Sequence, residues 1–435
     1  MISPRKTGLF VGDVLCIILG FTLFAALGYN GHSFGSIVHN HAVPFGIIGT
    51  LWIITMFVFN FYELRASKPT LAFLRNFGIA AIIMLVVGFV FFYLIPTTRI
   101  TPKMNLVIFE AISLALVLIW RRAFYNITRN SFRTRFAIIC AEEAYHPLIA
   151  EITENPHLGL EFQGSFKTIR DFKTADPAVD LVIIHKTANE ETKLLEEMLA
   201  SHIEVISLAE AYETILYRIP VEFIDNEWIV HSITKSAQLW YRAVSRLLAI
   251  LVATLVLVIT SPVSIAIIIA IKIEDRGPIL IRQERVGLHG AIFRLYKFRS
   301  MIVLGADGQA ETGTPIWSSG TNDPRVTRVG SITRRLHIDE IPQLFNVLIG
   351  DISLVGPRPE RPDFVKKLES EIPYYFMRHT VSPGFTGWAQ IKFRYARSIM
   401  DSREKFEYDL YYLKNRNLFL DFGILAKTIQ IIFTH

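Results

Sequence analysis

Long apolar segments dominate the first part of the chain. Four of them, residues 9–29, 45–62, 77–95 and 105–120, are each close to the ~20 residues that a helix needs to cross a bilayer. Two acids interrupt them: we interpret Asp13 as lying near a helix end and Glu110 as having partners on neighbouring helices. The pattern predicts a membrane protein whose residues 1–125 form a four-helix transmembrane domain.

The loops between these segments indicate an orientation. Lys and Arg gather before the first segment, between the second and third, and after the fourth, whereas the other loops have few or none. Basic residues favour the cytoplasmic side of a membrane. The N-terminus and everything after Arg121 are therefore expected in the cytosol.

In residues 134–222, short apolar runs alternate with helical stretches, as in a soluble α/β domain. Apolar runs of strand length at 136–140, 181–185 and 204–206 are separated by helical stretches such as 191–199. This alternation predicts βαβ units, a parallel sheet and a Rossmann-like domain. A nucleotide site would need a glycine-rich turn after the first strand, but residues 141–144 are Ala-Glu-Glu-Ala. We interpret the domain as regulatory or oligomerising.

A fifth apolar run, residues 247–271, follows a linker over 223–241. Ser261 and Pro262 interrupt its middle, and proline removes a backbone donor, so a kink is expected. Basic residues flank the run on both sides, which favours two cytosolic ends and a re-entrant helix whose freed backbone groups Ser261 or neighbouring helices would pair. A plain fifth span, placing residues 272–435 outside, is the alternative.

Composition and charge restrict the function classes. The chain is 51% hydrophobic and contains 32 Phe, too apolar for an ordinary soluble enzyme. Its net charge of +6 is not arranged as a basic stripe, so anionic lipids and phosphate substrates explain it better than nucleic acid. Cys16 and Cys140 are the only cysteines, and neither a disulfide nor a CxxC site is expected. Membrane lipids are expected partners, and a homodimer through the membrane or middle domain is reasonable.

Charged residues, Pro and Gly become frequent after residue 271, and a later apolar stretch, 418–433, predicts an interfacial or core-packed helix. Strings at 297–301, 334–343, 356–359 and 383–388 together describe a polyphosphate site. Three arginines offer planar forks for phosphate oxygens, and a lysine offers a compact charge. These basic residues are Arg299, Arg334, Arg358 and Lys297.

Asp339 and Glu340 form an acidic pair within this basic surrounding. Carboxylates repel phosphate, so the pair makes sense where one holds a hard cation such as Mg²⁺ and the other attacks phosphorus. The apolar spacing after the pair predicts a helix that begins close to it, with Pro342 in the first turn. The helix start is expected to keep Asp339 ionised and to favour nearby phosphate. The bland alternative is a helix-capping acid pair.

Residues 242–435 resemble the catalytic domain of the polyprenyl-phosphate hexose-1-phosphate transferases, also called the bacterial sugar transferase family. The whole chain resembles the large members, which have four spans, a Rossmann-like middle domain and a monotopic, α-rich catalytic domain on a re-entrant helix. One departure is His337-Ile338, where members often have Ser-Leu or Arg-Leu. The matching strings are Ser261-Pro262, 297–301, Arg334 with the acid pair five residues later, 343–347, 350–351, 355–359 and 383–390.

The resemblance implies a ping-pong reaction on the cytoplasmic face of a bacterial inner membrane. Asp339 would attack the sugar-bearing phosphate of a UDP-sugar and release UMP, and undecaprenyl phosphate would then accept the sugar phosphate. Glu340 would hold Mg²⁺. Phosphate binding would fall to Arg334 and Arg358, with Lys297 and Arg299 beside them, and Ser261-Pro262 would break the re-entrant helix.

Such a product would initiate exopolysaccharide, capsule or O-antigen synthesis. Two other functions are open. A membrane-anchored nucleotide-sugar sensor would have an inactive transferase domain, which the retained acids and arginines argue against. An ordinary glycosyltransferase would release UDP instead of UMP, so the nucleotide product separates the two kinds of enzyme.

Overall fold

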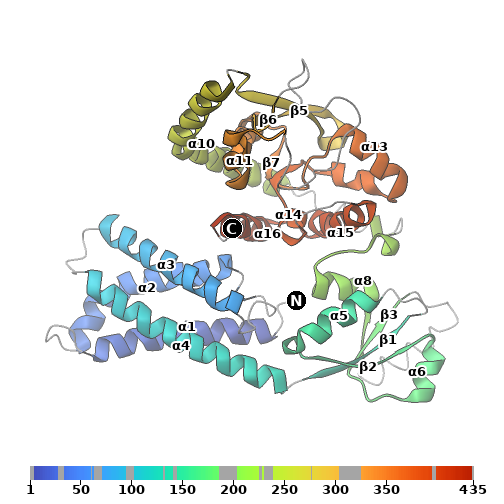
Figure 1. The fold of residues 1–435 in the computed structure, drawn as a ribbon. Coiled ribbons are helices and arrows are strands. Elements are labelled where there is room, and N and C mark those ends of the chain that lie inside the picture. Colours follow the sequence, from blue (N-terminus) through green and yellow to red (C-terminus); the bar gives the residue numbers. More distant parts are fainter. Residues whose placement is uncertain are drawn as a thin grey trace. The chain divides into compact units, whose positions relative to one another are not determined.

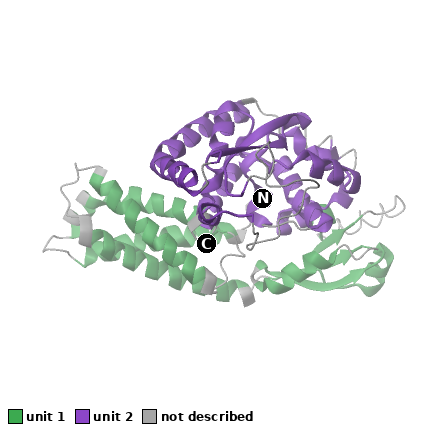
Figure 2. Cartoon of the chain, turned by 45° about the horizontal axis from the view of Figure 1, so that its top comes forward, with its two compact units in different colours: residues 1–211 green, residues 212–435 purple. Residues whose placement is uncertain are grey.

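The computed structural model divides the chain into two compact units, residues 1–211 and 212–435 (Figure 2). Each unit is described by itself. The described residues are 4–27, 34–59, 61–62, 71–94, 102–130, 133–140, 145–185, 203–224, 228–229, 239–275, 277–302, 325–393 and 398–433.

Four helices form the first part of unit 1 and lie side by side (Figure 1). They are α1 (Pro4–Ala26), α2 (Phe34–Val58), α3 (Leu71–Leu94) and α4 (Pro102–Asn130). They pack around a core rich in phenylalanine, and α1, α2 and α3 are apolar nearly all round, whereas α4 also contains charged residues. The four predicted helices of residues 1–125 are therefore confirmed as helices.

Four helices within the described residues are long and apolar enough to cross a membrane, and they indicate a membrane protein. The qualifying stretches are Lys6–Ala26, His41–Val58, Phe73–Tyr93 and, in unit 2, Trp240–Glu274. α4 contains the fourth predicted span but is not among them. It includes the charged residues Glu110, Arg121 and Arg122.

Asp13 and Arg121 form a buried ion pair between α1 and α4, with side chains 0% and 2% exposed. Arg121 also donates from Nη1 to the backbone carbonyl of Phe61 at 2.7 Å. Because α1 begins at Pro4, Asp13 lies well inside this helix, and the expectation of a position near a helix end is wrong.

The second part of unit 1 contains a four-stranded parallel sheet of order β2-β1-β3-β4. The three predicted runs form β1 (Thr134–Ile139), β3 (Leu181–Ile184) and β4 (Glu204–Ser207). The predicted parallel sheet is thus confirmed. β2 (Leu160–Phe166) was not predicted, although its residues alternate between apolar and polar; none of them is fully buried in this edge strand. Residues 141–144 and 191–199 lie outside the described residues.

Short helices complete this part: α5 (His146–Glu154) and α6 (Ile169–Ala175) lie next to β2, and α8 (Leu208–Ala211) follows β4. Cys16 and Cys140 are not joined in a disulfide, as the sequence predicts.

The longest helix of unit 2 among the described residues is α10 (Leu239–Asp275), and Pro262 lies inside it. A helical proline leaves the carbonyl four residues earlier without its usual donor. Here that carbonyl belongs to Val258, and Ser261 Oγ donates to it at 2.8 Å. The prediction that Ser261 pairs a freed backbone group is confirmed.

The remainder of unit 2 contains two small sheets (Figure 1). An antiparallel hairpin joins β5 (Leu280–Val286) to β6 (Ile292–Phe298), and β7 (Ser353–Val355) pairs in parallel with β8 (Gly384–Thr386). The predicted helix over 418–433 is α16. The helices are α11 (Arg328–Arg335), α12 (Gln343–Ile349), α13 (Pro362–Glu371), α14 (Trp388–Lys392), α15 (Ile399–Asn415) and α16 (Leu418–Phe433).

Residues 212–224 pack into unit 2, although the sequence places them in the middle domain. Ile219 and Val221 are 1% and 3% exposed within its core. The Ile219 amide donates to the carbonyl of Glu407 at 3.1 Å, and Trp388 Nε1 donates to the carbonyl of Tyr217 at 2.9 Å. Apolar burial and backbone pairing therefore join this segment to the unit that contains the acid pair.

Candidate active site

The acid pair lies on a single turn of 3₁₀ helix, Ile338–Glu340, directly before α12. Pro342 is the N-cap of α12, so the prediction of a helix that begins close to the pair is confirmed. His337 precedes the turn with φ 55°, in the left-handed region that histidine enters more readily than most side chains. His337 thus separates the end of α11 from the turn that contains the acid pair.

Glu340 is fixed by two cations. Its Oε1 accepts from Arg358 Nη2 at 2.6 Å and from Lys297 Nζ at 3.1 Å. Burial alone would raise the pKa of Glu340, but Arg358 and Lys297 outweigh it and hold this pKa well below its usual range. Glu340 is consequently a carboxylate at any physiological pH, as the sequence argument requires of a cation ligand.

Asp339 lies in a different electrostatic setting from its neighbour. Its side chain is 9% exposed, and this burial raises its pKa, while Lys297 and Arg334 partly offset the effect. The helix start, which was expected to favour the ionised form of Asp339, does not lower its pKa: α12 begins only at Gln343, and burial is the largest influence on this carboxyl. The pKa values of these two adjacent carboxyl groups are thus shifted in opposite directions, which is typical of carboxyls that have different roles in one site.

Arg334 stands on the last turn of α11 with its Nη1 buried and without a hydrogen-bond partner among the described residues. A buried, unpaired guanidinium nitrogen is costly, and an anionic ligand would satisfy it. α11 is held in place by Gly330, where a Cβ would meet the carbonyl oxygen of Ser300 at 2.0 Å. The 297–301 string therefore supplies Lys297 and also the backbone of Ser300, against which α11 packs.

Arg299 belongs to the same string but points elsewhere. It is 4% exposed, and its Nη1 lies so close to Gly277 that a Cβ there would meet it at 1.9 Å. Gly277 follows the end of α10. The side chain of Arg299 thus packs at the junction of α10 and β5.

Asn346 ties α12 to the β6 strand that contains Lys297. Its Oδ1 accepts from the amide of Tyr296 at 3.0 Å, and its Nδ2 donates to the carbonyl of Arg294 at 2.8 Å and to Asp351 at 2.9 Å. All its polar groups are paired although it is 0% exposed. The 343–347 and 350–351 strings therefore set the distance between Lys297 and Glu340.

Arg358 is positioned by a close approach of two backbone segments. A Cβ on Gly356 would meet the carbonyl oxygen of Ser382 at 2.4 Å, and one on Gly384 would meet the Gly356 nitrogen at 2.1 Å. Glycine at both positions lets the Gly356 amide donate to Thr386 and the Gly384 amide donate to Pro357, each at 2.9 Å. The 356–359 and 383–388 strings thus form one structural unit.

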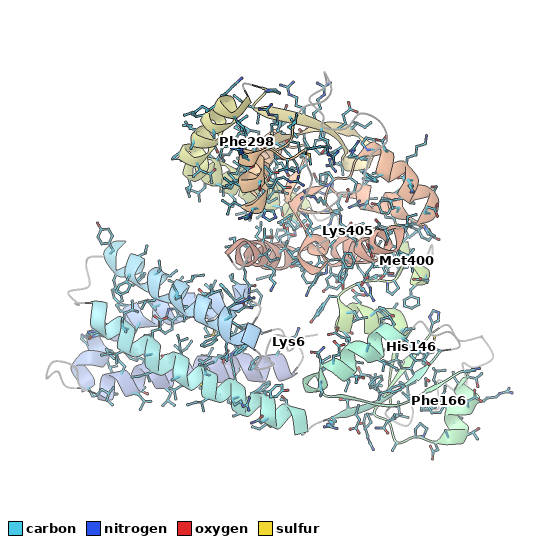
Figure 3. All side chains as sticks on the ribbon, viewed as in Figure 1. Lys6, His146, Phe166, Phe298, Met400 and Lys405 are labelled. Carbon is cyan, nitrogen blue, oxygen red and sulfur yellow. The ribbon has the colours of Figure 1, made fainter. Side chains whose placement is uncertain are left out.

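A buried charge network behind Arg358 was not identified from the sequence. Arg378 donates to Asp409 at 3.0 Å, and Glu360 accepts from Lys405 of α15 at 2.8 Å (Figure 3). Arg285 donates to the carbonyl of Pro359 at 3.0 Å, and burial lowers its pKa to about 10. The sequence signal that could have revealed this network is the presence of charged residues among the apolar positions of the buried face of α15.

No three His, Cys, Asp or Glu side chains in the described part of the chain form a group that could hold a metal ion. Two carboxylates are nevertheless enough for Mg²⁺, which keeps several waters and takes further oxygens from substrate phosphates. Glu340 is ionised and Asp339 adjoins it, so the donor chemistry fits. Any ion here would share Glu340 with Lys297 and Arg358.

The chain is similar to characterised proteins. The model of the family described as bacterial sugar transferase matches residues 240–435. A UDP-N-acetylgalactosamine-undecaprenyl-phosphate N-acetylgalactosaminephosphotransferase of Aeromonas hydrophila is 34% identical over 355 residues, covering 80% of this chain and 77% of the relative.

Two further relatives match smaller shares of the chain. A UDP-glucose:undecaprenyl-phosphate glucose-1-phosphate transferase of Escherichia coli is 40% identical over 43% of this chain and 40% of its own length. An undecaprenyl-phosphate galactose phosphotransferase of Salmonella typhimurium is 34% identical over 55% of this chain and 51% of its own length. With the Aeromonas match covering both units, the chain belongs to the bacterial sugar transferase family and is a transferase.

Proposed function

We propose that this protein transfers a sugar 1-phosphate from a UDP-sugar to undecaprenyl phosphate and releases UMP. The relatives' names describe such phosphotransferases and differ in the sugar, which is N-acetylgalactosamine, glucose or galactose. The observation that supports the reaction most is the division within the acid pair. Glu340 is ion-paired to Arg358 and Lys297, whereas Asp339 lies beside it without that restraint.

In the first step, an Asp339 carboxylate oxygen forms a bond to the phosphorus that bears the sugar. The bond from that phosphorus to the bridging oxygen breaks, and UMP leaves with the electron pair. In the second step, a phosphate oxygen of undecaprenyl phosphate attacks the same phosphorus and releases the Asp339 carboxylate. Covalent catalysis of this kind divides one difficult displacement into two easier ones.

The basic residues would stabilise the charge of the transferred phosphoryl group. Arg334 has a buried nitrogen free for an anion, and Lys297 and Arg358 bring positive charge to Glu340 and its surroundings. Arg299, packed against Gly277, would act by supporting the fold of the site. Mg²⁺ held by Glu340 would neutralise phosphate charge and favour departure of UMP.

A panel of UDP-sugars assayed for UMP tests this proposal. Wild-type protein with undecaprenyl phosphate and Mg²⁺ is expected to release UMP from one sugar of the panel, and Asp339→Asn to abolish release. Denaturing wild-type protein during turnover with radiolabelled sugar should trap a sugar-phosphoryl adduct on Asp339. Release of UDP would indicate an ordinary glycosyltransferase, and absence of turnover with every sugar would favour a sensor.

α10 is proposed to enter the membrane from the cytoplasmic face of the bacterial inner membrane and to return to it. Pro262 lies in its middle with the freed carbonyl paired by Ser261, and basic residues precede and follow the apolar run. A membrane-impermeant thiol reagent tests this on Lys366→Cys, an exposed position of α13, with both native cysteines replaced. Labelling from the periplasmic side alone would establish a plain span.

The middle domain is proposed to be Rossmann-like, with a regulatory or oligomerising role. Its parallel order β2-β1-β3-β4 supports this fold. The product of the reaction would begin the assembly of a polysaccharide such as exopolysaccharide, capsule or O-antigen.

A further inference from the structure

A cavity of about 310 Å³ lies in unit 2 between the first turns of α10, the β7 region and α16. None of the acid pair, Lys297 or Arg358 lines it. The cavity is thus separate from the candidate active site, and its size is at the lower end of ligand pockets.

One wall of the cavity is apolar. Its apolar lining comes from α10, α16 and β7: Leu248, Val252, Phe422, Leu425 and Leu354. These side chains offer no hydrogen bonds, so the complementary ligand surface is a hydrocarbon.

The polar part of the lining is dominated by three arginines, Arg242, Arg246 and Arg416. Arg246 is already engaged, since it donates to the carbonyls of Val347 and Leu348 at the end of α12. Arg242 is exposed, and Arg416 lies with its guanidinium carbon 5.9 Å from the centre of the Tyr241 ring. The charge at this end is therefore positive, and the exposed side chain of Arg242 is accessible to a ligand.

Asp421 is the one acid of this lining, and its carboxylate is directed to protein donors. Its Oδ2 accepts from Tyr241 at 2.7 Å and its Oδ1 from Tyr412 at 3.0 Å. Burial raises the pKa of Asp421 to about 6, while the two tyrosine hydroxyls act in the opposite direction. The three arginines consequently outweigh this single carboxylate, and an anion is favoured over a cation.

The two helices that form the apolar wall also have apolar faces outside the cavity. Only 11% of the apolar part of α10 is buried. On α16, Phe419 is 80% exposed and does not line the cavity. Arg242 and Arg246 precede the apolar run of α10, so they mark the level at which that helix changes from polar to apolar surroundings.

We infer that this cavity binds a phospholipid, with the anionic headgroup at Arg242 and Arg416 and part of one acyl chain against Leu248, Val252 and Leu425. Hydrocarbon and phosphate are the two chemistries that the lining complements, and a phospholipid contains both. Such a lipid would link α10 to α16 and stabilise their orientation at the membrane surface. The inference does not depend on the identity of the sugar or on Asp339.

The test uses the full-length protein in detergent, delipidated and titrated with three probes under native mass spectrometry. Dioleoyl phosphatidylglycerol contains both chemistries, dioleoylglycerol lacks the phosphate, and inorganic phosphate lacks the chains. One phosphatidylglycerol is expected to bind saturably, at least tenfold tighter than dioleoylglycerol. Equal binding of both lipids would overturn the role of the arginines, and full competition by inorganic phosphate would show a simple anion site.

Variants locate the binding. The double change Arg242→Gln with Arg416→Gln, and separately the cavity-filling Val252→Trp, are each expected to weaken phosphatidylglycerol binding at least tenfold. Lys367→Gln removes one exposed charge from α13, outside the cavity, and should bind as wild type. Equal binding by all these variants would overturn the inference. The melting temperature of each variant without lipid shows that it is folded.

The phospholipid cavity must be distinguished from the binding site of the acceptor, undecaprenyl phosphate. Asp339→Asn is expected to bind phosphatidylglycerol as tightly as wild type, so failure of the proposed function leaves this result unchanged. Undecaprenyl phosphate at equal concentration should not displace the phosphatidylglycerol. Displacement at equimolar concentration would assign the cavity to the acceptor and overturn a separate phospholipid site.

Discussion

Arg378 donates from Nη2 to the backbone carbonyl of Arg358 at 2.9 Å, so a buried guanidinium holds the loop from which Arg358 reaches Glu340. The same Nη2 lies 3.0 Å from Asp409 Oδ2, and both side chains are 2% exposed. A chain of polar contacts therefore connects α15 to the acid pair. Changes at Asp409 should reach the site without any contact between this residue and a substrate.

Asp409→Ala tests this connection. Removing one partner of a buried ion pair leaves an uncompensated charge and costs about 3–5 kcal/mol. We expect a lower melting temperature, and a loss of kcat larger than any change in KM, because Arg358 is no longer held against Glu340. Asp409→Asn keeps an acceptor for Arg378 and should recover part of both losses.

Glu404→Ala is the matched control for Asp409→Ala. Glu404 accepts from Arg218 at 2.6 Å, but its side chain is 40% exposed. Exposed pairs contribute only about 0–1 kcal/mol, so stability and kcat should change little. Equal losses of kcat in the Glu404 and Asp409 variants, at equal stability, would refute a positioning role for Arg378.

The sequence predicted that Lys297, Arg358 and the acid pair belong to one site, and the structure brings the side chains of Lys297 and Arg358 to Glu340. Strand β6 positions Lys297, and Gly356 allows the close backbone approach that positions Arg358. Spacing along the chain also placed the acid pair just before a helix. The helix start is a short-range consequence of the sequence, whereas the contacts of Glu340 with Lys297 and Arg358 join residues 43 and 18 positions apart and depend on the fold.

Other features depend on tertiary packing that no local pattern encodes. Arg299 looks equivalent to its basic neighbours in sequence, yet its guanidinium packs against Gly277. Asp409 looks like an ordinary helix charge, and only the fold buries it beside Arg378. Ile219 lies upstream of the expected catalytic domain, but its side chain completes that unit's core.

Replacement of Ile219 tests whether residues 212–224 stabilise unit 2. Its side chain is 1% exposed, and Ile→Ala at such a site costs about 2–5 kcal/mol through lost burial and the cavity left behind. Ile219→Ala should therefore lower the melting temperature of the full-length protein. Ile292→Ala, at a position 61% exposed, should change stability by about 0.5 kcal/mol or less. Equal shifts would mean that the segment contributes nothing to the core.

His379 should make stability depend on pH. Burial lowers its pKa to about 4, and the neighbouring Arg378 acts in the same direction. The unfolded chain takes up a proton near pH 6.5 and the folded chain only near pH 4, so stability falls as pH drops through this interval, by roughly 3 kcal/mol. His379→Gln should remove this part of the slope.

The stability of wild type and of His379→Gln is compared at each pH, because Glu407 changes stability with pH in the opposite direction. Burial raises the pKa of Glu407 to about 7, so its contribution to stability falls as pH rises from about 4.5 to 7. Unfolding midpoints in denaturant at several pH values between 4 and 7 give the difference. Parallel curves for wild type and His379→Gln would exclude the predicted titration.

The Asp13–Arg121 pair gives a prediction for unit 1 that is independent of the catalytic chemistry. Both side chains are almost fully buried between α1 and α4, and Arg121 also faces the rings of Phe61 and Tyr62. Asp13→Leu or Arg121→Met alone leaves one buried charge without its partner, which costs about 3–5 kcal/mol. Thermal unfolding in detergent measures the loss.

The double variant Asp13→Leu with Arg121→Met contains neither charge. Desolvation of two ions is then avoided, so the double variant should be more stable than either single variant, with a favourable interaction energy in the cycle. Arg121→Met also removes the bond to the Phe61 carbonyl, so full recovery of wild-type stability is not expected. Losses that simply add in the double variant would show that the two charges do not stabilise one another, and that the helix packing alone determines the stability of this bundle.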